Sequence, residues 1–131
     1  MRKLTILLLL TMVLVACGGD DGPVQVEIIS LDHSPIRPAV EEVTGVVAEF
    51  GDAVVMESYN FDTPEGTAFA EEHDLDEHTP IAVFVNGEME FEINGRFVKF
   101  YSFPQGGGTG MVAEGVWTMD DLRAVLEQET Q

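Results

Sequence analysis

The chain has little cysteine and little positive charge. Of its 131 residues only Cys17 is a cysteine, and six are lysine or arginine against 24 aspartate or glutamate. A single cysteine excludes a disulfide framework and any site that needs two thiols from this chain. The formal net charge of −18 repels phosphate groups, so nucleic acid and anionic lipid headgroups are not expected ligands.

The sequence also lacks an apolar run of full membrane-spanning length. Its longest run covers residues 4–15, after the basic residues Arg2 and Lys3, whereas a transmembrane helix needs about 20 apolar residues. A short basic start followed by such a run predicts an export signal. Such a segment can be a lipoprotein signal that ends just before Cys17. The alternatives to a lipoprotein signal are an ordinary signal peptide, in which Cys17 is incidental, and an N-terminal transmembrane anchor.

The apolar run ends in Leu14-Val15-Ala16-Cys17-Gly18, which resembles the bacterial lipobox. The resemblance implies a lipoprotein signal peptide at residues 1–16 and fatty acyl chains such as palmitate on Cys17. Two or three acyl chains make a stable membrane anchor. We therefore expect a lipid-anchored protein of the cell envelope, facing the periplasm or the extracellular side.

Residues 17–23 are predicted to be the lipidated cysteine and a tether, because glycine, aspartate and proline follow Cys17 without an apolar side chain to bury. Six extended residues reach about 20 Å, which keeps the folded part close to the membrane. The remaining residues 24–131 are enough for one domain. Without Arg2 and Lys3 the mature chain has four basic and 24 acidic residues, a net charge of −20.

Hydrophobic periodicity predicts two strand-helix pairs in the first half of this domain. Alternating apolar residues indicate a strand over residues 24–30, and apolar positions at helical spacing indicate a helix over residues 38–50. A second β-branched stretch covers residues 53–59. Thr63 followed by Pro64 and Glu65 is a helix start signal, and the helix it opens is expected to reach about His73.

The second half reads as strands, two tight turns and a last helix. Residues 81–85 form a continuous apolar run, typical of a strand buried on both faces. Asn86-Gly87 and Asn94-Gly95 are hairpin signals, and residues 96–103 alternate and should pair back on the preceding strand. Thr118-Met119-Asp120-Asp121 has capping-box spacing and predicts a helix that ends near Gln128.

Two motifs stand at the junctions of these elements. Asp32-His33-Ser34-Pro35-Ile36-Arg37-Pro38 lies between the first strand and the first helix, and Thr79-Pro80 directly precedes the strand at 81–85. With the order β-α-β-α-β-β-α, which leaves room for an extra strand in the late hairpins, they resemble the thioredoxin superfamily from about residue 24 to 128. The resemblance implies an α/β, thioredoxin-like three-layer sandwich with a mixed central sheet.

The same resemblance places His33 and Ile36 where redox-active relatives carry the two cysteines of Cys-x-x-Cys. Thr79-Pro80 looks like the Thr/Val-cis-Pro of the family, so a cis bond is expected before Pro80. Thiol-disulfide exchange needs an attacking and a resolving thiol, and neither position has sulfur. We therefore expect no disulfide oxidoreductase or isomerase activity.

The function expected from the resemblance is binding of an envelope protein or peptide. By resemblance the corresponding groove is formed by residues of the two motifs, which would dock an extended peptide by backbone pairing. The alternative is that these residues are relics that only shape the fold. The residues of this predicted groove are His33, Ser34, Pro35, Ile36, Thr79 and Pro80.

Other side-chain patterns give weaker signals. His73 and His78 lie five residues apart among carboxylates, which does not match a helical metal-ligand pair, so a solvated acidic loop is favoured. The glycine-rich segment 104–110 lacks the Gly-Lys-Ser/Thr of a phosphate loop, and Ser34 beside His33 lacks an oxyanion motif. No metal site and no cofactor are expected. Two alternatives stay open, namely a thiol-independent accessory enzyme subunit that uses His33 and an acidic metal-binding envelope protein.

Overall fold

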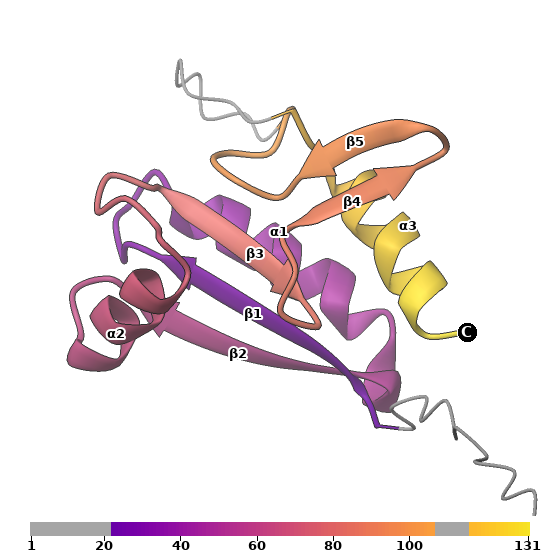
Figure 1. Ribbon diagram of the computed structural model, residues 1–131, viewed down its shortest axis with the longest axis horizontal. Helices are drawn as coiled ribbons and strands as arrows, with labels where there is room; N and C mark the ends of the chain where they lie inside the picture. Colours follow the sequence, from indigo (N-terminus) through magenta and orange to yellow (C-terminus); the bar gives the residue numbers. More distant parts are fainter. Residues whose placement is uncertain (1–21, 107–115) are drawn as a thin grey trace, which may run out of the picture.

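The computed structural model describes residues 22–106 and 116–131, which form a mixed α/β fold with a three-stranded sheet, a two-stranded sheet and three helices (Figure 1). The predicted signal peptide, the predicted lipidation site at Cys17 and most of the glycine-rich loop lie outside the described residues. The elements follow one another in the predicted order, with one additional strand in the late hairpins.

The central sheet contains parallel and antiparallel neighbours. Strand β1 (Val24–Ser30) lies between β2 (Val54–Asn60), which is parallel to it, and β3 (Ile81–Val85), which is antiparallel. All five residues of β3 are buried, as its continuous apolar sequence predicts. The mixed sheet that the resemblance implies is therefore present.

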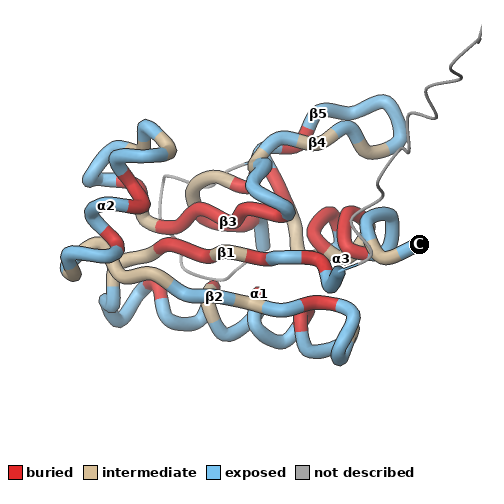
Figure 2. Tube along the Cα trace, turned by 60° about the horizontal axis from the view of Figure 1, so that its bottom comes forward, coloured by how far each residue is buried: buried red, intermediate tan, exposed pale blue. Residues whose placement is uncertain are grey.

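Alternation along the strands divides the core into two clusters. Val26 and Ile28 of β1 face the larger cluster, to which helices α1 (Arg37–Ala48) and α3 (Met119–Glu129) contribute. Ile29 faces the smaller cluster, which includes Phe69 and Ala70 of α2 (Pro64–Glu72). Two helices thus cover one face and the short α2 covers part of the other. The buried residues of the sheet lie mainly in β1 and β3, whereas β2 is mostly intermediate or exposed (Figure 2).

Local capping chemistry sets two helix starts where the sequence predicts them. The Thr63 hydroxyl accepts a hydrogen bond from the Gly66 N–H at 3.1 Å at the start of α2. At α3 the Thr118 and Asp121 side chains form a complete capping box. Helix α1 begins with a proline in its first turn and ends at Ala48, two residues before the predicted end. The Glu49 and Phe50 N–H groups bond to carbonyls three residues earlier, both at 3.1 Å, and a short 3-10 helix (Gly51–Ala53) follows.

Both predicted hairpin turns are confirmed. Asn86 and Asn94 each have φ of 51°, and the following Gly87 and Gly95 have φ of 80° and 77°, as a type I′ turn requires at its two central positions. The second turn joins β4 (Glu90–Ile93) to β5 (Arg96–Lys99), which form the separate two-stranded sheet.

The stretch predicted as one strand over residues 96–103 is divided between two sheets. Its first half, β5, pairs with β4, whereas Phe100 and Ser102 exchange backbone hydrogen bonds of 2.9 Å with Val83 and Ile81 of β3. The break has a local cause, because the Tyr101 N–H bonds to the Lys99 carbonyl at 2.8 Å and closes a tight turn around Phe100. Residues 100–102 therefore extend the central sheet beyond β3.

Candidate functional site

Both motifs singled out in the sequence leave the same end of the central sheet. In the antiparallel pairing of β1 with β3, Ser30 is the partner of Ile81. The turn after β1 and the Thr79-Pro80 segment before β3 therefore begin beside each other. The carboxyl end of β2 is also here, because β1 and β2 are parallel and Ser30 pairs with Asn60. The ends of parallel strands are the usual place for a ligand site in open α/β sheets.

The turn after β1 presents three side chains and buries the fourth. The His33 carbonyl accepts hydrogen bonds from the N–H groups of Ile36 and Arg37, at 2.9 and 3.2 Å. His33, Ser34 and Pro35 are exposed, whereas Ile36 is 4% exposed and packs in the larger core cluster. The accessible part of the predicted groove on this side is thus residues 33–35.

An ion pair lies next to this turn. The Arg37 Nε donates to an Asp32 carboxylate oxygen at 2.8 Å, and both side chains are exposed. The hydrogen bond to Asp32, with the charge of that carboxylate, raises the pKa of the Arg37 guanidinium. A single exposed pair of this kind contributes little to stability, so its main effect is to fix two opposite charges at the start of α1.

The expectation of a cis bond before Pro80 is wrong. No peptide bond in the described segments is cis, so the chain enters β3 through a trans Thr79–Pro80 bond. A turn supplies the change of direction, because the Thr79 N–H bonds to the Asp76 carbonyl and the His78 N–H bonds to the Asp76 carboxylate, at 2.9 and 2.8 Å. Thr79 is 1% exposed and Pro80 is partly exposed.

Two pockets flank Leu31 at this end of the sheet. One, of about 400 Å³, lies between the end of β2 and the start of α1 and is lined partly by Asp32, Arg37 and Tyr59. The other, of about 470 Å³, lies against α2 and the segment before β3 and is lined partly by Glu71 and His78. Sequence reasoning did not name the β2 residues of the first pocket. These residues could have been predicted from a parallel pairing of the first two strands, because that pairing brings the carboxyl ends of both strands to the same edge of the sheet.

The three histidines have different surroundings. His73, at the C-cap of α2, packs against Phe69 and Phe84 with ring centroids 4.3 and 4.4 Å apart, and Tyr59 stacks on Phe69 at 4.2 Å. His33 and His78 are exposed. In residues 22–106 and 116–131 no three His, Cys, Asp or Glu side chains are grouped as metal ligands.

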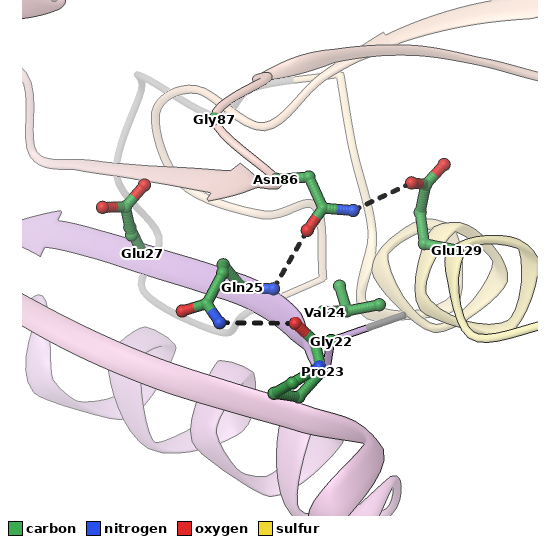
Figure 3. A pocket seen from close by; sticks show the side chains of 8 residues that line it. All are labelled: Gly22, Pro23, Val24, Gln25, Glu27, Asn86, Gly87 and Glu129. Carbon is green, nitrogen blue, oxygen red and sulfur yellow. Dashed lines mark hydrogen bonds between the residues drawn. The ribbon is translucent and has the colours of Figure 1, made fainter. Parts of the chain in front are cut away.

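A further pocket, of about 410 Å³, lies near the start of β1 (Figure 3). Asn86 connects three elements here. Its side-chain oxygen accepts from the Gln25 N–H and its amide donates to a Glu129 carboxylate oxygen, both at 3.0 Å. The pocket thus joins β1, the first hairpin turn and the end of α3, and its lining includes the acidic residues Glu27 and Glu129.

The described segments contain four basic side chains, and all four are in ion pairs. Arg37 pairs with Asp32, Arg96 with Asp121, Lys99 with Glu90, and Arg123 with Glu49 and Asp120. The other carboxylates of the described surface have no basic side chain to neutralise them. Any ligand at this surface meets a negative potential.

Comparisons of the chain with protein-family models, with curated proteins and with solved structures find no match. Within residues 22–106 and 116–131, no helix has the length and apolar character to cross a membrane. The fold and the geometry define the class as a mixed α/β domain whose two sequence motifs leave the same end of its central sheet.

Proposed function

We propose that this chain is a lipid-anchored protein of the cell envelope whose thioredoxin-like domain binds a peptide or protein segment without thiol chemistry. The observation that carries the proposal is that the turn at residues 33–36 and the Thr79-Pro80 segment leave neighbouring strand ends at one end of a mixed sheet, where Ser30 pairs with Ile81. In the thioredoxin superfamily that position is the substrate-contacting surface. In this chain it has no sulfur.

The arrangement of the strands supports a thioredoxin-like domain. The order β2-β1-β3, continued by residues 100–102, combines one parallel neighbour with antiparallel pairing on the other side. Helices α1 and α3 pack on one face and α2 on the other, as a three-layer sandwich requires. The trans bond before Pro80 is a departure from the family pattern and alters the backbone next to the turn.

A function without thiol exchange is supported by the residues at the two positions where redox-active members of the superfamily carry cysteine. His33 is exposed but has no sulfur, and Ile36 is buried in the core. Exchange proceeds by attack of one thiolate and resolution by a second thiol, and the domain from residue 24 onward contains no cysteine. What residues 33–35 retain is an exposed surface beside a pocket, which suits binding.

The lipid anchor is supported by the position of Cys17 at the end of the apolar run. Growth of a producing strain with labelled palmitate should label the protein, and Cys17→Ser should abolish the label while the domain still folds. Labelling that survives Cys17→Ser contradicts the anchor.

The binding function is tested with the intact lipoprotein, purified in detergent and used to capture proteins from an envelope extract. A Ser34→Arg variant adds bulk and charge to the exposed turn, and Thr44→Arg places the same side chain on the exposed part of α1. We expect one specific band that Ser34→Arg removes and Thr44→Arg retains. A band unaffected by Ser34→Arg, or no specific band, contradicts binding at the turn.

A further inference from the structure

The outer edge of β2 is a free sheet edge with an unusual character. Among the residues that the structure describes, β2 pairs with β1 alone, and this pairing runs without a bulge over seven residue pairs. Proteins normally protect such edges with proline, lysine or a bulge, because the unpaired backbone groups attract another strand. Residues 54–60 contain no proline and no lysine, and their single charged residue is Glu57, so the edge is guarded by one negative charge alone.

Like charges lie side by side next to this edge. Glu57 of β2 is the direct partner of Glu27 of β1, so the two side chains are on the same face of the sheet. Directly opposed like charges destabilise a sheet. None of the ion pairs in the described segments involves either carboxylate, so the repulsion is not neutralised within the domain.

The neighbouring tyrosine reports the same negative environment. Burial, the hydrogen bond and charge of Glu57, and the charges of Glu27 and Glu72 raise the pKa of Tyr59. On the same face of β2, Val55 is 40% exposed. The face that borders the edge therefore presents an apolar residue, an acidic residue and an aromatic residue at alternate positions.

We propose that the outer edge of β2 docks an extended basic segment of another protein by strand addition. Backbone hydrogen bonds to the free edge supply the affinity. A lysine or arginine opposite Glu57 neutralises the Glu27–Glu57 pair, and apolar side chains two residues before and after it contact Val55 and Tyr59.

A pocket next to the strand gives the docked segment a second contact. The pocket of about 400 Å³ between β2 and α1 is lined by Ser58, Tyr59 and Asn60 of β2 and by Val40 of α1. Side chains alternate between the two faces of a strand. A residue adjacent to the basic one therefore points toward the α1 side, where this pocket lies.

A second copy of the chain is a poor occupant of this edge. Antiparallel pairing of two β2 strands about their centre places Glu57 opposite Glu57 of the other copy, which adds a further repulsion. Each mature copy also has a net charge of −20. The charges favour a basic partner instead. The inference shares the pocket between β2 and α1 with the candidate site. It rests on the β2 edge and not on the turn at residues 33–35, so it does not depend on the proposed function.

The test uses the mature full-length chain in nonionic detergent and a labelled synthetic peptide of the same length as β2. The peptide has threonine at its odd positions, valine at its second and sixth positions and lysine at its centre. Matched peptides have glutamate at the centre or an N-methylated backbone. Fluorescence anisotropy gives the affinity, and amide hydrogen exchange locates the protected residues.

We expect the lysine peptide to bind and to protect amides within residues 54–60. Glu57→Lys should weaken its binding by about fivefold, whereas Glu42→Lys, which makes the same charge change on exposed α1, should change it by less than about twofold. The proposal is overturned if no peptide binds, if the N-methylated peptide binds equally well, if protection lies outside β2, or if the unliganded protein is a dimer with β2 protected.

Discussion

The hydroxyl oxygens of Thr79 and Tyr101 lie 3.0 Å apart and share a hydrogen bond. This bond ties the segment before β3 to residues 100–102, whose backbone pairs with β3 itself. Because Thr79 is 1% exposed, water does not easily replace the missing partner when one hydroxyl is removed. The bond therefore fixes the segment that leads into β3, at the end of the sheet where the two sequence motifs lie.

Tyr101→Phe should lower the free energy of unfolding by about 1–2 kcal/mol, since it leaves the buried Thr79 hydroxyl without this partner. Thr79→Val in the same background should restore part of the loss, because both polar groups are then absent. Urea unfolding of the two single variants and the double variant gives the coupling energy. Additive losses contradict a direct interaction.

Gly66 is required by close approach of the backbone. A Cβ at this position would lie 1.8 Å from the Asn60 carbonyl oxygen, so Gly66→Ala must displace the start of α2 from the end of β2. We expect a loss of about 2 kcal/mol or more in unfolding free energy.

Gly45 in α1 supplies the matched control, because an added Cβ there meets nothing within 4 Å. Gly45→Ala should raise the stability by about 0.5–1 kcal/mol through the better helix propensity of alanine. Equal effects of the two alanine substitutions on thermal unfolding would show that the contact at Gly66 is not as described.

Asp121 combines two stabilising roles at the start of α3. It is 6% exposed, accepts a hydrogen bond from the Thr118 N–H at 2.8 Å and forms an ion pair with Arg96. Asp121→Ala should therefore cost about 2 kcal/mol. Asp120→Ala, one residue earlier and highly exposed, should cost less than about 0.5 kcal/mol. Chemical denaturation measures the unfolding free energy of both variants. Similar losses for Asp121→Ala and Asp120→Ala would argue against the capping box.

Tyr59 should ionise above pH 10, its ordinary pKa, because burial and nearby carboxylates raise the pKa. In a Tyr101→Phe background Tyr59 is the only tyrosine, so the phenolate absorbance reports it alone. Glu57→Gln should shift this titration toward pH 10.

The sign of the linked stability change follows from the same shift. Between pH 10 and the raised pKa of Tyr59, the unfolded chain has lost a proton that the folded chain keeps. The Tyr59 contribution to stability is therefore present below pH 10 and is lost as the pH rises through the folded pKa. A Tyr59 titration at or below pH 10 contradicts the negative environment at β2.

Elements set by local chemistry could be predicted from the sequence. Thr63 and Thr118 cap helices because their hydroxyls bond to N–H groups three residues later. Asn86-Gly87 and Asn94-Gly95 turn the chain because both residue types accept positive φ. These interactions involve residues close in sequence, so pattern alone identifies them.

Features set by distant contacts were not predicted. The kink at Phe100 depends on which sheet accepts each half of residues 96–103, and the alternating pattern is the same for both halves. The expectation of a cis bond before Pro80 came from the resemblance. In the structure the bond is trans, and the turn closed by the Asp76 carbonyl supplies the change of chain direction.

The burial of Ile36 could have been predicted from the spacing of apolar residues in the sequence. Ile36 continues the helical spacing of Val40, Val43 and Val47, and the structure places it in the same core cluster. The resemblance predicts only that Ile36 lies in the turn before the first helix. The helical spacing predicts that its side chain points in the same direction as those of Val40, Val43 and Val47.

Site-specific photo-crosslinking in intact cells tests the central claim most directly. A photoreactive amino acid is placed at Ser34 on the exposed turn, and the control places it at Thr44 on exposed α1. We predict one discrete crosslinked partner from position 34 that is absent from position 44. The same pattern from both positions, or no crosslink from position 34, contradicts a binding role for this end of the sheet.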